Sequence, residues 1–194
     1  MSIAVQNIPE ILIYEMVNGK PIYYKDYREY LDGKKQIEEL MGSSYLQSLI
    51  GTELVILLSQ LLDMRKYRIM SNEIGLKFAK KSWRAADLAI YEKASLKDVP
   101  LDNKYLEVAP EIVIEIDTKA NLEEVKNPLG YYQEKTDQLL NFGVKKVVWI
   151  FTDTKKIMIA ENIDDWQITS WRLDIEIVDG VNVNIADLIK SAEI

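Results

Sequence analysis

Two repeating patterns of hydrophobic positions run along the chain, one typical of strands and the other of helices. Continuous apolar runs at Ile112–Ile116 and Val147–Phe151 predict strands in the middle of a covered sheet. A leucine-rich stretch with helical spacing predicts a major core helix from about Ser43 to Leu62. An Asn-Pro pair at 127–128 is typical of a helix start, and this helix should end near 141–143.

The remaining segments predict short strands, turns and smaller helices. Two apolar runs on either side of Asn18-Gly19 predict a β-hairpin on a tight turn. Short strands are expected at Tyr67–Ser71, Gly75–Ala79, Ala85–Tyr91, Lys156–Ala160, Gln167–Trp171 and Asp174–Ile177, and shorter helices within 27–41 and 185–191. The central strand, helix and strand predict a mixed α/β fold. Because no repeat or linker interrupts the pattern, residues 1–194 are expected to form a single domain.

Three charged residues interrupt the apolar patterns. Asp87 and Glu115 lie inside hydrophobic strands, and Lys135 lies on the apolar face of the helix that follows 127–128. An unpaired charge away from water costs several kcal/mol or loses its proton, so the strand carboxylates are the expected partners of the lysine. Since side chains alternate along a strand, Glu115 and Asp117 are predicted to share one face.

This set of charges has two interpretations. Converging carboxylates repel one another unless a cation lies between them, and oxygen ligands favour Mg²⁺ or Mn²⁺. A metal that activates water, beside an ammonium that stabilises developing charge, would suit phosphodiester hydrolysis. The same residues could instead form a buried ion pair that only sets the packing. Convergence in an open cleft would favour catalysis, whereas a dry, closed cluster would favour the ion pair.

Composition narrows the chemistry further. The 194 residues are 48% hydrophobic and 28% charged, which is ordinary for a globular domain. The chain has no cysteine and no histidine, which excludes disulfides, histidine-based zinc sites and Ser-His-Asp triads. The net charge of −7 weighs against general coating of nucleic acid. Basic clusters within 77–84 and 145–156, the first of which includes Arg84, are interpreted as solvated strand ends.

Neither a membrane segment nor a secretion signal is expected. No apolar run approaches the roughly 20 residues that span a bilayer. The first residues lack the basic and apolar regions of a signal peptide. A cytoplasmic location is therefore predicted.

Six segments, in order along the chain, carry a family resemblance. They are Tyr14-Glu15-Met16-Val17-Asn18-Gly19, Arg84-Ala85-Ala86-Asp87-Leu88-Ala89, Val113-Ile114-Glu115-Ile116, Lys135 ahead of Gly143-Val144, Trp149-Ile150 and Gly180-Val181-Asn182-Val183. Together they resemble the Uma-type restriction endonuclease family, a bacterial branch of the PD-(D/E)xK nuclease superfamily. The resemblance covers most of the chain.

The resemblance implies a fold, a substrate and a set of site residues. The fold would be a restriction-endonuclease-like mixed central sheet flanked by helices, with an N-terminal hairpin and helices. The substrate would be DNA. Asp87, Glu115 and the main-chain carbonyl of Ile116 would hold Mg²⁺ or Mn²⁺, and Lys135 would supply the catalytic ammonium.

Three departures from the family pattern leave alternatives open. Ala86 replaces a proline, and Asp117 stands where the superfamily's usual Glu-x-Lys pattern has its lysine. Lys135 is taken as the replacement for that lysine and Lys119 as a second candidate. Where the family often has a histidine in its N-terminal helix, this chain has Leu46-Gln47.

Other functions also fit these residues. The acidic net charge and Asp117 favour a non-catalytic nuclease-fold module that binds DNA or a protein partner. A hydrolase of another phosphate ester would use the same metal site. If the protein cleaves both DNA strands, a homodimer is expected, because two cuts need two sites.

Overall fold

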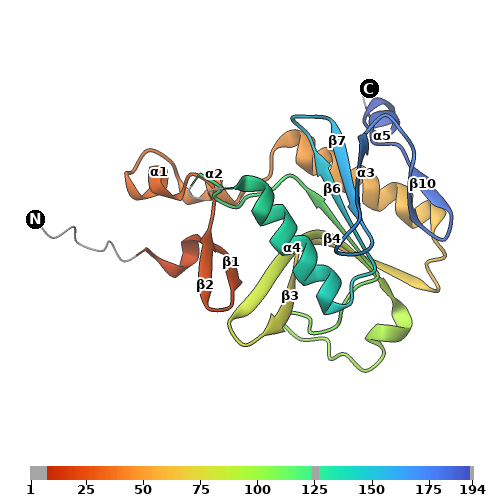
Figure 1. Ribbon diagram of the computed structural model, residues 1–194, viewed down its shortest axis with the longest axis horizontal. Coiled ribbons are helices and arrows are strands. Elements are labelled where there is room, and N and C mark those ends of the chain that lie inside the picture. The colour runs from red at the N-terminus through yellow and green to blue at the C-terminus, as the bar shows by residue number, and fades with distance from the viewer. Residues whose placement is uncertain (1–7, 124–126, 193–194) are drawn as a thin grey trace, which may run out of the picture.

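An eight-stranded mixed sheet forms the centre of the molecule (Figure 1). The computed structural model describes residues 8–123 and 127–192. The strands of the sheet are β1 (Ile13–Val17), β2 (Lys20–Tyr23), β3 (Tyr67–Ala79), β4 (Ser82–Glu92), β5 (Ile112–Ile116), β6 (Lys146–Phe151), β7 (Lys156–Ala160) and β8 (Trp166–Ser170). A separate antiparallel pair is formed by β9 (Ile175–Val178) and β10 (Val181–Val183).

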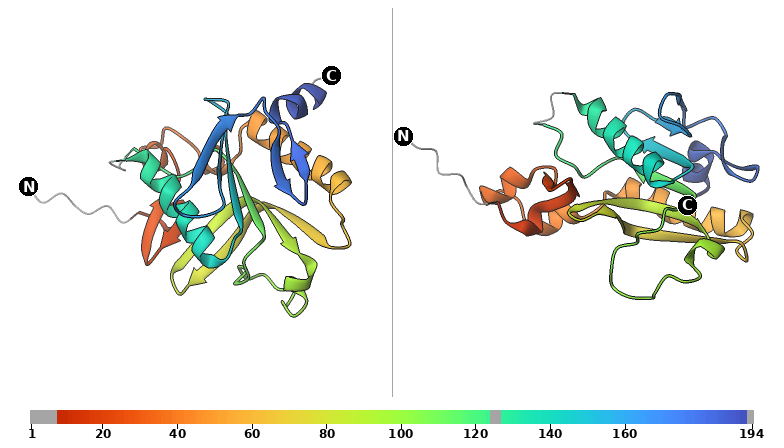
Figure 2. Two further views of the ribbon diagram at one scale, coloured as in Figure 1. Left: turned by 45° about the vertical axis from the view of Figure 1, so that its right-hand side comes forward. Right: turned by 60° about the horizontal axis from the view of Figure 1, so that its bottom comes forward.

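The helices lie on both faces of the sheet. They are α1 (Tyr27–Leu31), α2 (Ile37–Met41), α3 (Tyr45–Leu61), α4 (Pro128–Phe142) and α5 (Ile185–Ala192), with 3₁₀ turns η1 (Glu10–Leu12) and η2 (Lys93–Leu96). Figure 2 shows α3 and α4 on opposite sides of the central strands. Within the described residues, no helix is long and apolar enough to cross a membrane.

The strand order brings the predicted site residues to the middle of the sheet. It runs β2-β1-β4-β5-β6-β7-β8, with β3 paired to β4. Strands β5 and β6 are parallel and are joined through α4, whereas β4 and β5 are antiparallel. A parallel pair needs such a crossover, and its helix must cover one face of the sheet. The predicted mixed α/β architecture is confirmed.

Two hydrophobic cores fill the space between the sheet and its helices. On one face, α3 and α5 pack against the isoleucines of β5, with Ile50, Leu54 and Ile114 fully or almost fully buried. On the other face, α4 packs against the strand side chains that point the opposite way, including Val113 of β5 and Trp149 of β6. Alternation along β5 therefore separates the two cores, as expected for a strand covered on both faces.

The predicted elements agree with the structure except in β3 and at the end of the chain. The hairpin turns at Asn18 and Gly19, whose φ angles of 49° and 81° suit a primed turn. The two strands predicted over 67–79 are one continuous strand, β3. Its pairing with β4 shifts register between Ser71 and Ile74. The short strand β10 was not predicted as a strand.

Candidate functional site

Asp87 and Glu115 are cross-strand neighbours in the centre of the sheet. The antiparallel register pairs Leu88 with Ile114 and Ala89 with Val113, and its continuation places Asp87 opposite Glu115. The Asp87 carboxylate accepts a hydrogen bond from the backbone N–H of Ile116 at 2.7 Å. Opposed residues in such a pair have Cβ atoms about 4.5–5.5 Å apart, and two like charges there are destabilising without a cation nearby.

Lys135 supplies a cation from the helix above this pair. Its Nζ lies 3.0 Å from Oε1 of Glu115 and 2.8 Å from Oε1 of Glu15. Lys135 and Glu15 have no exposed surface, and Glu115 is 1% exposed. The expected pairing of Lys135 with a strand carboxylate is therefore present, and it lies in a closed environment.

Glu15, which the predicted site did not include, is the centre of this buried cluster. Its Oε2 lies 2.8 Å from Nη1 of Arg84 and accepts a hydrogen bond from the Tyr131 hydroxyl at 3.0 Å. The backbone N–H of Ala85 donates to Oε1 at 3.3 Å. The sequence carries a signal for Glu15, because it is an acid inside an apolar strand, as Asp87 and Glu115 are.

The interpretation of Arg84 as part of a solvated strand end is wrong. Its side chain is completely buried and forms an ion pair with Glu15, and its Nε donates to the side-chain oxygen of Gln138 at 2.8 Å. Burial of a guanidinium is tolerated because it is paired and hydrogen-bonded. We name the group Glu15, Arg84, Glu115 and Lys135 the buried charge cluster.

The environment shifts the pKa values of these groups in different directions. Burial raises the pKa of Glu115 to about 8, although the charge of Lys135 opposes the shift. Burial likewise raises the pKa of Asp87 above its usual value. Burial alone would raise the pKa of Glu15, but the charges of Lys135 and Arg84 lower it overall. Burial would lower the pKa of Lys135, yet the two carboxylates raise it, so this lysine stays protonated and cannot accept a proton.

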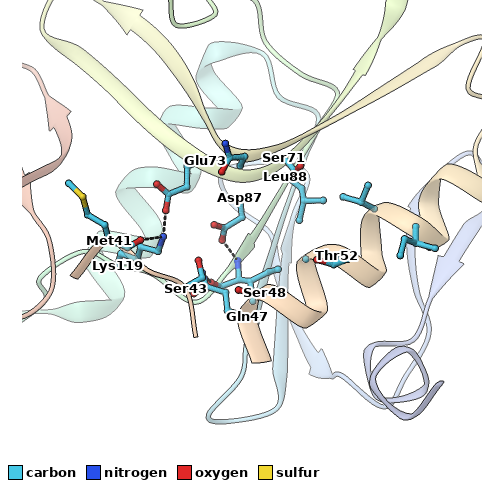
Figure 3. A pocket seen from close by; sticks show the side chains of 15 residues that line it. Met41, Ser43, Gln47, Ser48, Thr52, Ser71, Glu73, Asp87, Leu88 and Lys119 are labelled. Atoms are coloured by element: carbon cyan, nitrogen blue, oxygen red, sulfur yellow. Dashed lines mark hydrogen bonds and ion pairs between the residues drawn. The ribbon is translucent and has the colours of Figure 1, made fainter. Parts of the chain in front are cut away.

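A pocket of about 670 Å³ opens on the other side of these strands (Figure 3). Residues of α3, β3 and β4 line it, together with the segment after β5. Of the predicted site residues, Asp87 and Ile116 line the pocket. Glu115 and Lys135 are not among the lining residues. Asp87 thus faces the pocket, whereas its neighbour Glu115 is buried.

Two further residues, Gln47 and Asp117, satisfy polar groups at the ends of β5 and β6. Gln47 of α3 donates its side-chain N–H to the Ile116 carbonyl at 2.8 Å. Asp117 accepts hydrogen bonds from the backbone N–H and the hydroxyl of Thr152, at 2.9 Å and 2.6 Å. Because β5 ends at Ile116 and Asp117 has a φ of 58°, the predicted strand alternation does not extend to Asp117.

The donor set is chemically suited to a hard cation but is small. Asp87, Glu115 and the Ile116 carbonyl offer oxygen only, and Mg²⁺ commonly combines one or two carboxylates with several waters. Both carboxylates have raised pKa values, so a cation between them would stabilise their ionised forms. Over residues 8–123 and 127–192, no group of three or more Asp, Glu, His or Cys side chains is arranged to hold a metal ion.

Comparison with known proteins identifies a matching fold. No model of a protein family matches the chain, and no curated protein sequence matches it. Among the solved structures that match is that of a putative nuclease belonging to DUF820 from Anabaena variabilis ATCC 29413. The two structures agree with a TM-score of 0.65 and 14% sequence identity, over 91% of this chain and 89% of that chain. The fold is therefore the restriction-endonuclease-like mixed sheet flanked by helices.

Proposed function

We propose that this protein is a metal-dependent phosphodiesterase that cleaves DNA, a Uma-type nuclease of the PD-(D/E)xK superfamily. The observation that carries the proposal is the cross-strand pairing of Asp87 with Glu115, in which Asp87 lines the pocket and Glu115 is buried beside Lys135. A fold shared with a protein described as a putative nuclease supports the same conclusion.

The residues divide the work of hydrolysis between them. Asp87, Glu115 and the Ile116 carbonyl would hold Mg²⁺ or Mn²⁺, which supplies polarisation of the phosphoryl oxygen and activation of water. Lys135 is too deeply buried to face the pocket. We assign it to Glu115, whose ionised form it favours through its charge at 3.0 Å. Lys135 is thus a positioning residue in this proposal.

One observation favours a second function, a non-catalytic module that binds DNA or a protein. In the buried charge cluster, the carboxyl groups of Glu15 and Glu115 lie against the two cations of Arg84 and Lys135. Such a closed set of paired groups needs no metal, and ion pairs of this kind also occur for purely structural reasons.

A plasmid-nicking assay with Mn²⁺ or Mg²⁺ separates the two functions. Wild-type protein should convert supercoiled plasmid to the nicked form, and chelation of the metal should stop it. Asp87→Asn should lower the rate by at least about 100-fold, because the metal loses a charged ligand. Lys135→Met, which keeps the unbranched side chain but removes the charged terminal nitrogen, should lower the rate without changing the circular dichroism spectrum of the folded protein.

Direct measurement of metal binding completes the test. Titration calorimetry with Mn²⁺ should detect binding to the wild type and much weaker binding to Asp87→Asn. If the wild type neither nicks plasmid nor binds Mn²⁺ in a way that depends on Asp87, the enzymatic proposal fails. The non-catalytic module would then be the better conclusion.

A further inference from the structure

Lys119 and Glu73 form an ion pair on the wall of the pocket, next to Asp87 (Figure 3). The Lys119 ammonium also donates to the backbone carbonyl of Met41 at 2.8 Å. The two side chains are 11% and 33% exposed, so the pair lies at the boundary between protein and solvent. It is separate from the buried charge cluster, whose members do not line the pocket.

The backbone that carries Glu73 is strained. Asn72 and Glu73 have φ angles of 71° and 54°, a left-handed conformation that residues other than glycine adopt rarely. They lie where β3 shifts its register against β4. Such irregularities in a strand change the direction of a side chain, and strained residues persist where the surrounding structure holds them, often at functional sites. Here the result is a carboxylate that meets Lys119 on the pocket wall.

The chemistry of the pocket wall suits a nucleic-acid backbone. Hydroxyl and amide side chains dominate its polar part, namely Ser43, Gln47, Ser48, Thr52, Ser71 and Asn72. Groups of this kind, like lysine and arginine, commonly donate hydrogen bonds to phosphate and sugar oxygens. Of the described residues that line the pocket, Lys119 is the one cation. An anion that enters would find this cation already engaged by Glu73.

We propose that Lys119 binds a backbone phosphate of the substrate, and that Glu73 pairs with Lys119 until that phosphate replaces it. The proposal rests on the proposed function, and it adds a substrate contact outside the metal site. The exchange is non-covalent: one anion leaves the ammonium and another takes its place. Glu73 therefore competes with the phosphate for Lys119, and only a nucleic acid that places a phosphate at this lysine gains the contact.

Binding of DNA without cleavage tests this exchange. The probe is a fluorescein-labelled DNA duplex of about 20 base pairs, measured by anisotropy with Ca²⁺ in place of Mg²⁺, over a range of salt concentrations. Glu73→Gln should bind about 3- to 10-fold more tightly than the wild type, because Lys119 no longer has a competing anion. Lys119→Gln should bind more weakly, with a salt slope reduced by about 1. The double variant should bind as weakly as Lys119→Gln.

Glu107→Gln is the matched control. Glu107 forms an ion pair with Lys77 on an exposed surface outside the pocket, at 2.5 Å. Its substitution changes the net charge by the same amount as Glu73→Gln, so it removes the general effect of a less acidic protein. The affinity of Glu107→Gln for the duplex should stay within about twofold of wild type.

Three results would overturn the proposal. Glu73→Gln could bind no more tightly than Glu107→Gln, the double variant could bind as tightly as Glu73→Gln, or none of the proteins could bind the duplex. The first two leave plasmid nicking and its dependence on Asp87 untouched, so they are distinguishable from failure of the proposed function. If Glu73→Gln does not fold, the test is to compare the salt slope of Lys119→Gln with that of Lys77→Gln. Equal slopes reject the proposal.

Discussion

Lys135 and Lys119 are two lysines on opposite sides of one pair of strands, and their surroundings differ sharply. Lys135 is completely buried and lies between the carboxylates of Glu15 and Glu115. Lys119 lies at the edge of the pocket, with one carboxylate partner, Glu73. Solvent can reach the second pair but not the first.

The difference teaches how burial divides the roles of similar charges. An ion pair without water is hard to break, because each partner would be left unpaired in a medium of low dielectric. A pair at a wet surface contributes little to stability and can change partners at low cost. We therefore expect the buried charge cluster to determine stability and the pocket residues to determine binding.

Of the three substitutions that follow, Glu15→Ala should lower the free energy of unfolding most. The change leaves the cations of Arg84 and Lys135 without their shared carboxylate, and loss of one partner from a buried pair costs about 3–5 kcal/mol. Urea denaturation would measure the loss in the free energy of unfolding. Glu107→Ala, which removes an exposed ion pair, should leave the denaturation midpoint close to wild type. A loss below about 1 kcal/mol for Glu15→Ala would mean that the cluster is not the structural centre described here.

Asp87→Asn, in the pocket, should abolish activity but leave stability almost unchanged. The asparagine oxygen can still accept the hydrogen bond from Ile116, and burial already disfavours the charged form of Asp87, whose pKa is raised. The free energy of unfolding should therefore change by less than about 1 kcal/mol, while metal-dependent nicking is lost. A fall of more than about 2 kcal/mol would place Asp87 with the structural residues instead.

Gln47→Ala should have the smallest effect and sharpen the position of the metal. Gln47 donates to the Ile116 carbonyl beside the pocket, where water can replace it, so a loss of about 0.5 kcal/mol or less is expected. If the Ile116 carbonyl is a metal ligand, removal of this competing donor should leave the Mn²⁺ affinity unchanged or higher in calorimetry. A tenfold weaker affinity would show that Gln47 itself supports the metal.

Local patterns predicted those parts of the fold that depend on neighbouring residues. The hairpin, α3, β5, β6 and α4 follow from turn residues and from hydrophobic periodicity, and all are present close to the expected positions. The inward direction of Lys135 follows from its helical position in the same way. The register shift in β3 has no local signal of this kind, since two left-handed residues other than glycine contradict intrinsic preference.

The surroundings of Arg84 could not be predicted locally for a different reason. Whether an arginine at a strand start faces water or the core depends on the presence of a buried anion, and Glu15 lies 69 positions earlier in the chain. Glu15 itself carries a local signal, as an acid inside an apolar strand, but its pairing with Arg84 does not. The open pocket depends on contacts between α3, β3 and the segment after β5, which only the assembled sheet brings together.

The contacts of Glu15 also constrain the order in which the molecule can assemble. Glu15 meets Arg84 across 69 positions and Tyr131 across 116, so closing these loops is entropically costly and slow. The hairpin brings the carboxylate that pairs with Arg84 and one of the two that pair with Lys135. Docking of β1 and β2 and the exclusion of water from the core between the sheet and α4 should therefore occur in one cooperative step. The hairpin, which looks peripheral in Figure 1, is therefore expected to be needed for the core to fold, because it carries Glu15.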